Sequence, residues 1–309
     1  MKIVILDGLT LGNINLKIFE DLGELIIYQT TPKNETIQRL QEADIVLTNK
    51  VVIDKEVIDN TNLKMIQVLA TGMNNVDIEY AKQKGIIVKN VAGYSTESVA
   101  QLTFAFVLNI MNKINYYDEY SKTKYSDSEI FTHIVDFEEL NNKTWGIIGL
   151  GNIGKKVAQI ASSFGCEVVY YSTSGKNNDD KYKKVSLNEI LKSDIISIHA
   201  PLNENTNNLL NANNLNLIKK GAILINMGRG GIVNEKDLAE IIDKKGFYAG
   251  FDVFTKEPIS KDNPLLNVKN IILTPHIAWA SVEARGKLVK LAYENLENFI
   301  SGTYDAKTL

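Results

Sequence analysis

The chain has 309 residues, enough for two domains, and its 44% hydrophobic and 23% charged content is that of an ordinary globular protein. A net charge of −3 gives no reason to expect nucleic acid or an anionic membrane surface as a partner. The single cysteine, Cys166, excludes an internal disulfide and suits a reducing compartment. No apolar run reaches the ~20 residues of a membrane span, and no secretory signal is apparent. We therefore expect a cytoplasmic protein without a membrane partner.

The first ninety residues alternate short apolar runs with polar–apolar stretches of helical length, such as Glu35–Glu42 and Asp77–Lys84. This alternation is typical of a parallel, doubly wound sheet covered by helices. The expected strands are Lys2–Leu6, Leu25–Tyr28, Asp44–Leu47, Met65–Leu69 and Ile86–Val88.

The same alternation resumes after Thr144, with a helix expected over Lys155–Phe164. The chain is therefore predicted to form two α/β domains, with a ligand-binding cleft between them. Residues with chemical roles are expected just beyond the carboxyl ends of the strands. These strands are Trp145–Ile148, Glu167–Tyr171, Ile195–His199, Ala222–Asn226, Tyr248–Phe251 and Ile271–Leu273.

Between the two sets of strands lie an apolar helix, Ser95–Asn112, and a polar stretch, residues 115–142. The polar stretch carries many aromatic side chains, which a solvated connector rarely needs. We interpret it as an arm that packs on a second subunit; the alternative is a loop folded on its own domain. Its histidine, His133, is expected to have no catalytic role. The aromatic residues are Tyr116, Tyr117, Tyr120, Tyr125, Phe131 and Phe137.

Residues 149–154 spell GLGNIG between an expected strand and an expected helix. In this setting Gly149 permits a tight turn, Gly151 lets the backbone approach a pyrophosphate, and Gly154 allows close packing of helix on strand. The N-terminus of the helix then faces the anion. The run predicts a bound dinucleotide.

About twenty residues beyond this loop, an NAD-specific protein usually has an Asp or Glu for the ribose hydroxyls. This chain has Ser172 there, so a 2′-phosphate is not repelled. Ser172 and Thr173 can donate hydrogen bonds to that phosphate, and Lys176 can pair with it. The alternative for Lys176 is a solvated charge in a turn. The sequence thus favours NADP(H) slightly over NAD(H) and leaves both open.

Three residues that follow strands can support proton transfer and anion binding. Arg229 lies among glycines, where its planar fork is well placed to bind a carboxylate. His276 can deliver a proton near neutral pH, and a carboxylate such as Glu257 would orient its ring. The sequence alone does not show that Glu257 and His276 meet. A surface arginine in a turn and a histidine satisfied at a strand end are the alternatives. His199, followed by Pro201, is interpreted as a cofactor-side or structural residue.

Together these segments resemble the D-isomer-specific 2-hydroxyacid dehydrogenase family over nearly the whole chain. The resemblance rests on GLGNIG, on SDIISIHAPL at 193–202, on KGAILINMGRG at 220–230, and on the order arginine, glutamate, Pro-His. It implies that Arg229 binds a 2-oxo acid, His276 is the acid/base and Glu257 orients it. It also implies a homodimer, and a Rossmann cofactor domain (94–280) inserted in a flavodoxin-like substrate domain (1–93 and 281–309).

The resemblance implies further contacts to substrate and cofactor, and no metal. The backbone N–H groups of Thr71 and Gly72 would bind the substrate carboxylate, and Trp279 would also face the substrate. Lys50 matches a position where a phosphoglycerate-type relative uses a basic residue; a solvated loop charge is the alternative. The implied cofactor contacts are Thr96, Gly149, Gly151, Asn152, Ile153, Gly154, Ser172, Thr173, Lys176, His199, Pro201, Thr206, Met227, Gly228, Arg229, Asp252, His276 and Ala278.

The segments KNVAGYS at 89–95 and HIAWAS at 276–281 resemble the glycerate dehydrogenase (hydroxypyruvate reductase) branch. The expected activity is hydride transfer between NAD(P)H and a small 2-oxo acid, giving the D-2-hydroxy acid. Hydroxypyruvate and glyoxylate are the expected substrates. Phosphoglycerate-type and D-lactate-type dehydrogenases remain alternatives, as does a non-catalytic dinucleotide sensor.

Overall fold

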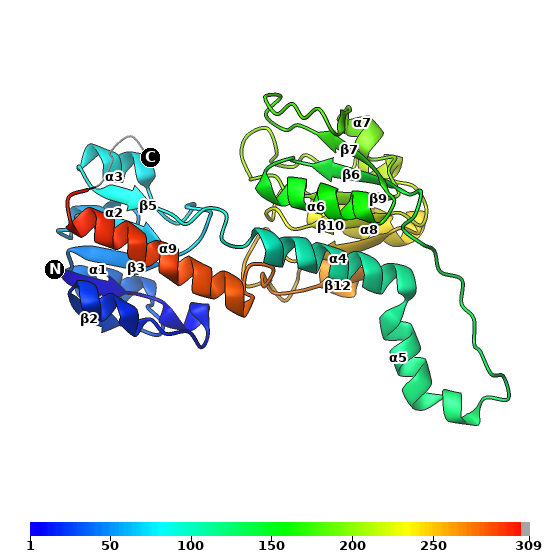
Figure 1. Cartoon of the computed structure of the whole chain (residues 1–309), viewed down its shortest axis with the longest axis horizontal. Helices are drawn as coiled ribbons and strands as arrows, with labels where there is room; N and C mark the ends of the chain where they lie inside the picture. Colours follow the sequence, from blue (N-terminus) through cyan, green and yellow to red (C-terminus); the bar gives the residue numbers. More distant parts are fainter. Residues whose placement is uncertain (304–309) are drawn as a thin grey trace. The chain divides into compact units, whose positions relative to one another are not determined.

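The computed structural model describes residues 1–303. The chain divides into two compact units (Figure 1). Unit 1 comprises Met1–Ser95 and the described residues from Ala280 onward, and unit 2 comprises Thr96–Trp279. Each unit is built on one parallel sheet, which confirms the predicted fold class of two doubly wound α/β domains.

The sheet of unit 1 has the strand order β2-β1-β3-β4-β5 with every pair parallel, which is the flavodoxin-like order. Every residue of β3 and β4 is buried, as expected when helices cover both faces of a parallel sheet. The strands are β1 (Lys2–Ile5), β2 (Glu24–Ile27), β3 (Ile45–Thr48), β4 (Met65–Val68) and β5 (Ile87–Lys89).

The helices of unit 1 are mostly short, apart from α9 near the end of the chain. The buried face of α9 includes Leu288, Ala292 and Leu296, which are spaced four residues apart. The helices are α1 (Thr36–Leu40), α2 (Lys55–Asp59), α3 (Ile78–Gln83) and α9 (Val282–Ile300). The 3-10 turns are η1 (Gly8–Leu11), η2 (Lys17–Leu22) and η3 (Lys33–Glu35).

The sheet of unit 2 has the parallel order β12-β11-β10-β9-β6-β7-β8. This is the Rossmann order with one more strand at the β12 edge, and the direction of winding reverses between β6 and β9. The predicted strands are all present; β8 was not predicted because Lys183 and Lys184 have no apolar character. The strands are β6 (Thr144–Ile148), β7 (Glu167–Tyr171), β8 (Lys183–Lys184), β9 (Ile195–Ile198), β10 (Ile223–Asn226), β11 (Tyr248–Phe251) and β12 (Ile271–Leu273).

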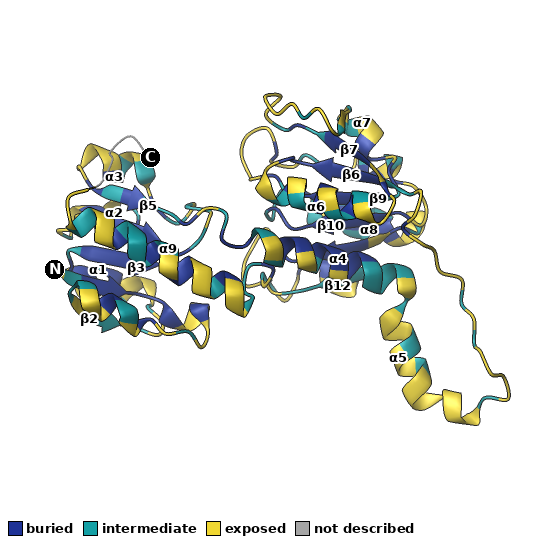
Figure 2. Cartoon of the chain, viewed as in Figure 1, coloured by how far each residue is buried: buried dark blue, intermediate teal, exposed yellow. Residues whose placement is uncertain are grey.

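The apolar helix α4 packs against α6 and β10, with the rings of Phe104 and Trp145 4.7 Å apart. By contrast, α5 has no buried residue, and Figure 2 shows it mostly exposed. The helices are α4 (Thr96–Asn112), α5 (Ile114–Thr123), α6 (Asn152–Ser163), α7 (Leu187–Ile190) and α8 (Glu235–Lys245). The 3-10 turns are η4 (Tyr125–Asp127), η5 (Leu215–Leu217) and η6 (Pro264–Asn267). Within residues 1–303, no helix has both the length and the apolar character that crossing a bilayer requires.

Candidate active site

The three glycines of the 149–154 loop differ in what a side chain at each would meet. Gly149 has φ +93°, and a Cβ there would lie 2.9 Å from the Ala200 nitrogen. A Cβ at Gly154 would overlap the Gly149 carbonyl oxygen, so this glycine lets α6 pack closely on the loop. A Cβ at Gly151, in contrast, would meet no atom within 4 Å. Gly151 therefore borders open space in front of the helix.

That open space faces the N-terminus of α6. Gly151 is the N-cap and supplies no side-chain cap, and the first turn contains no acidic residue. The first N–H groups of the helix, together with the positive end of its dipole, are thus available to an anion. These residues fit the pyrophosphate of a dinucleotide.

The turn after β7 carries the residues expected near the adenosine ribose. Ser172 is buried, and its Oγ accepts a hydrogen bond from Asn177 N at 3.3 Å. Lys176 is exposed. Lys184 Nζ donates to Gly175 O at 2.9 Å and adds a second ammonium group to this turn. Sequence reasoning missed Lys184 because it belongs to the unpredicted strand β8.

His199 is not suited to act as an acid. Its Nε2 lies 3.0 Å from Ser197 Oγ, which also accepts a hydrogen bond from Trp145 Nε1. Among the described atoms, its buried Nδ1 has no partner. Burial lowers the pKa of His199 to about 3, so the ring is neutral near pH 7. Thr206 likewise has an internal contact, because its hydroxyl donates to Pro201 O at 2.6 Å and accepts from Asn203 N at 2.8 Å.

Arg229 follows β10 in a loop whose backbone is hydrogen-bonded to the side chain of Asn226. Asn226 Oδ1 accepts from Gly228 N, and its Nδ2 donates to Arg229 O, both at 3.0 Å. The guanidinium itself donates to the Gly228 carbonyl at 2.8 Å. No carboxylate of the described residues pairs with Arg229 in a salt bridge. Its other N–H groups can therefore bind an anionic ligand.

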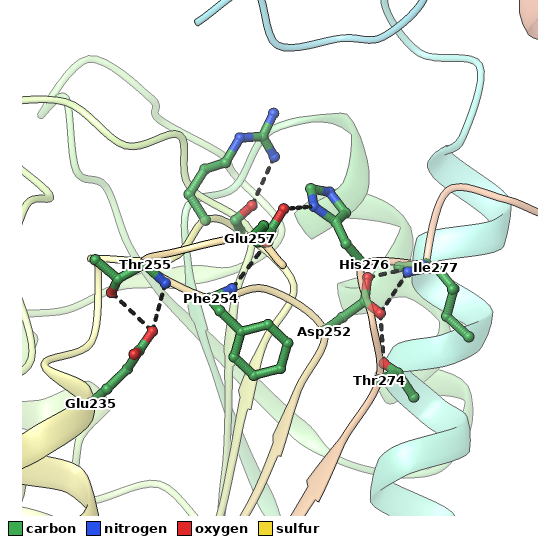
Figure 3. A network of polar contacts seen from close by, with 11 residues as sticks. Glu235, Asp252, Phe254, Thr255, Glu257, Thr274, His276 and Ile277 are labelled. Atoms are coloured by element: carbon green, nitrogen blue, oxygen red, sulfur yellow. Dashed lines mark hydrogen bonds and ion pairs between the residues drawn. The ribbon is translucent and has the colours of Figure 1, made fainter. Parts of the chain in front are cut away.

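His276 follows the end of β12 after Thr274 and Pro275, and it has φ +56°, a left-handed conformation that is unfavourable for a residue with a side chain. The carboxylate of Asp252 fixes this turn by accepting hydrogen bonds from Ile277 N and Ala278 N, both at 2.8 Å (Figure 3). Thr274 Oγ1 donates to the same carboxylate at 2.6 Å. Burial raises the pKa of Asp252, while these hydrogen bonds and the nearby imidazole favour its charged form.

The structure brings Glu257 and His276 together. Glu257 Oε2 lies 2.6 Å from His276 Nδ1, and Oε1 accepts a hydrogen bond from Phe254 N at 3.0 Å (Figure 3). The carboxylate thus orients the ring through Nδ1 and leaves Nε2 as the nitrogen that can exchange a proton with a substrate.

The loop of Arg229 and the loop of Glu257 are in direct contact. A Cβ at Gly230 would overlap the carbonyl group of Phe254, so only glycine lets the two backbones approach this closely. The strands β10, β11 and β12 are adjacent in the sheet. The loops that follow them carry, in turn, Arg229, Glu257 and His276. This arrangement can bind an anion and transfer a proton in one region of unit 2.

The predicted substrate loop lies in unit 1, beyond β4. Thr71 O accepts from Asn90 Nδ2 at 2.6 Å, and Thr71 Oγ1 donates to Val91 O at 3.2 Å. Lys50 is exposed, but its backbone N–H donates to the buried carboxylate of Asp7 at 2.6 Å. Asp7 was missed in the sequence because a lone carboxylate after a strand gives no distinctive pattern.

The structure places the remaining predicted residues as follows. Met227 and Gly228 are buried after β10, and Ala278 is buried beside Asp252. Thr96 begins α4, and Trp279 is half-buried at the end of unit 2. Among residues 1–303, no cluster of His, Cys, Asp and Glu is arranged to hold a metal ion.

Comparison with known proteins identifies the family to which this chain is similar. A family model described as "D-isomer specific 2-hydroxyacid dehydrogenase, NAD binding domain" matches residues 104–278. A hydroxypyruvate reductase of Blautia hydrogenotrophica is 40% identical over 98% of this chain and 98% of its own. A glyoxylate reductase of Aeropyrum pernix is 35% identical over 89% of this chain and 85% of its own. The solved structure of an acyclic imino acid reductase in complex with NADPH and D-Arg is 32% identical, has a TM-score of 0.88, and covers 98% of both chains.

The match to the family model and the extent of these identities confirm the resemblance drawn from the sequence motifs. The chain belongs to the D-isomer specific 2-hydroxyacid dehydrogenase family.

Proposed function

We propose that the protein reduces hydroxypyruvate or glyoxylate to the corresponding 2-hydroxy acid, of D configuration where C2 is chiral, using a reduced nicotinamide dinucleotide. The observation that carries this proposal is the 2.6 Å contact of His276 with Glu257, next to the loop of Arg229. The glycine loop at the start of α6 supports the dinucleotide. The names of the hydroxypyruvate and glyoxylate reductases similar to this chain support the choice of substrate.

When bound, the dinucleotide supplies the hydride that adds to C2 of the 2-oxo acid. Arg229 binds the substrate carboxylate and stabilises charge that develops on the carbonyl oxygen. His276 donates its Nε2 proton to that oxygen, which completes the hydroxyl group. Glu257 keeps the ring oriented through Nδ1 and stabilises the imidazolium before the proton leaves. In the reverse direction, His276 accepts the proton as a base.

We propose roles in substrate binding for residues of unit 1 and for Trp279 as well. The N–H groups of Thr71 and Gly72 bind the substrate carboxylate, which is supported by the hydrogen bonds that anchor this loop. Lys50 adds a positive charge for substrates with a further anionic group. Trp279 limits the size of the substituent at C3 of the substrate.

The purified protein should oxidise NADPH or NADH faster with hydroxypyruvate and glyoxylate than with pyruvate or bulkier 2-oxo acids. H276A should lower kcat by roughly 10²–10⁴-fold, because it removes the proton donor. Dinucleotide affinity should stay within about twofold of the parent, since the cradle at Gly151 is intact. Cofactor absorbance and fluorescence titration measure the two quantities. Equal kcat in variant and parent would remove His276 from this role, and binding without turnover would favour the dinucleotide-sensing alternative.

The preferred cofactor is proposed to be NADP(H). Residues 172–178 contain no acidic side chain that would repel a 2′-phosphate. Ser172 lies at the end of β7, and the ammonium groups of Lys176 and Lys184 belong to the same turn or contact it. Hydroxyl groups and ammonium groups are suitable partners for a phosphate.

S172D should lower kcat/KM for NADPH by at least about tenfold relative to NADH, because it places a carboxylate where the phosphate would bind. K184A should lower kcat/KM for NADPH and leave kcat/KM for NADH unchanged. K183A is the matched control, since neighbouring strand side chains point to opposite faces of the sheet. A parent protein with a strong preference for NADH would contradict the proposal.

The protein is proposed to form a homodimer through residues 115–142. Large apolar side chains of this segment are exposed, among them Phe131 at 92% and Ile134 at 73%. A hollow of about 510 Å³ lies between the ends of the segment and β12. An exposed apolar surface with adjacent hollows is typical of a subunit interface.

F131D should convert the dimer to a monomer, because it would place a carboxylate in the apolar contact. Light scattering after size-exclusion chromatography measures the mass. L266D is the control, since Leu266 is 47% exposed on η6, outside this segment. A monomeric parent, or an F131D variant that remains dimeric, would refute the interface.

A further inference from the structure

We infer that Glu235 is a positioning residue for the Glu257–His276 pair. Glu235 is the first residue of α8, and its carboxylate accepts hydrogen bonds from the loop after β11. Oε1 accepts from both Thr255 N at 2.6 Å and Thr255 Oγ1 at 2.9 Å (Figure 3), while Oε2 accepts from Asn263 Nδ2 at 2.7 Å. The inference deepens the proposed function, since it assumes that the pair carries the proton transfer.

Hydrogen bonds hold the exposed part of this loop, between the core residues Phe254 and Ile259. Residues 255–258 are all exposed, so no buried side chain fixes the backbone between Phe254 and Pro258. Thr255 directly follows Phe254, whose N–H donates to Glu257 Oε1. Thr255 and Lys256, both exposed, connect Phe254 to Glu257. The carboxylate of Glu235 therefore binds the loop at Thr255, next to Phe254, whose N–H orients Glu257.

The start of α8 does not need this carboxylate. Asn234 is the N-cap of the helix, and its side chain accepts the N–H of Asp237 at 3.1 Å. The Glu235 carboxylate instead accepts hydrogen bonds from residues beyond the helix, Thr255 and Asn263. Its contacts therefore stabilise the loop that carries Glu257.

Asp237 provides a matched control. It lies in the same first turn, carries the same charge, and its carboxylate also accepts a backbone N–H from another loop, that of Ala212 at 2.8 Å. Both carboxylates therefore have similar relations to the helix dipole. They differ in which loop they hold.

E235A should release the loop and weaken the contact between Glu257 and His276. With hydroxypyruvate, kcat should fall by about tenfold while dinucleotide Kd stays within about twofold, because loss of positioning affects the chemical step. E235Q should fall between parent and E235A, because its amide oxygen can still accept from Thr255. D237A should match the parent.

A second measurement does not depend on activity. His133, His199 and His276 are the chain's three histidines, so ring ¹⁵N shifts in histidine-labelled protein can be assigned with single variants. In the parent, Nδ1 of His276 should carry a proton near neutral pH, and E257Q gives the reference spectrum without the ion pair. E235A should move the Nδ1 shift toward that of E257Q, and D237A should not.

Unchanged Nδ1 shifts and kcat in E235A would overturn the inference, as would equal effects of E235A and D237A. If E235A does not fold, T255V tests the same contact by removing one donor, and it should change the Nδ1 shift in the same direction. If the parent reduces no 2-oxo acid, the proposed function fails, but the shifts still decide whether Glu235 positions the pair.

Discussion

The hydrogen bond between His276 Nδ1 and Glu257 Oε2 is the interaction on which the proposed chemistry of this protein depends. It is set by the sheet of unit 2, because β11 and β12 are adjacent and parallel and their loops leave the same edge. Asp252 stabilises the left-handed turn at His276, and Gly230 lets the arginine loop contact the loop of Glu257. A change in any of these contacts would move the imidazole relative to the loop of Arg229.

Both units use a buried aspartate at the end of a strand to organise a loop. Asp252, after β11, accepts two backbone N–H groups beyond β12, and Asp7, after β1, accepts those of Asn49, Lys50 and Val51 beyond β3. Leaving one such buried N–H without a partner costs about 1–3 kcal/mol. Each carboxylate therefore specifies one loop conformation where functional residues were predicted.

The sequence predicted the strands, the glycine loop and the residues at strand ends, because these depend on local patterns of apolar residues and glycine. The strand β8 escaped prediction because two lysines carry no apolar signal. The contact between Glu257 and His276 was left open, since it joins two loops and depends on strand order. Glu235 and Asp7 were missed for the same reason, because their partners are distant in sequence. Lys184 was missed together with β8, to which it belongs.

The most direct test of the central claim is the single-turnover rate of hydride transfer in E257Q, with dinucleotide and hydroxypyruvate at saturation. If Glu257 orients and charges the ring of His276, this rate should fall at least about tenfold and the dinucleotide Kd should be unchanged. A rate equal to that of the parent would show that proton transfer does not depend on the pair.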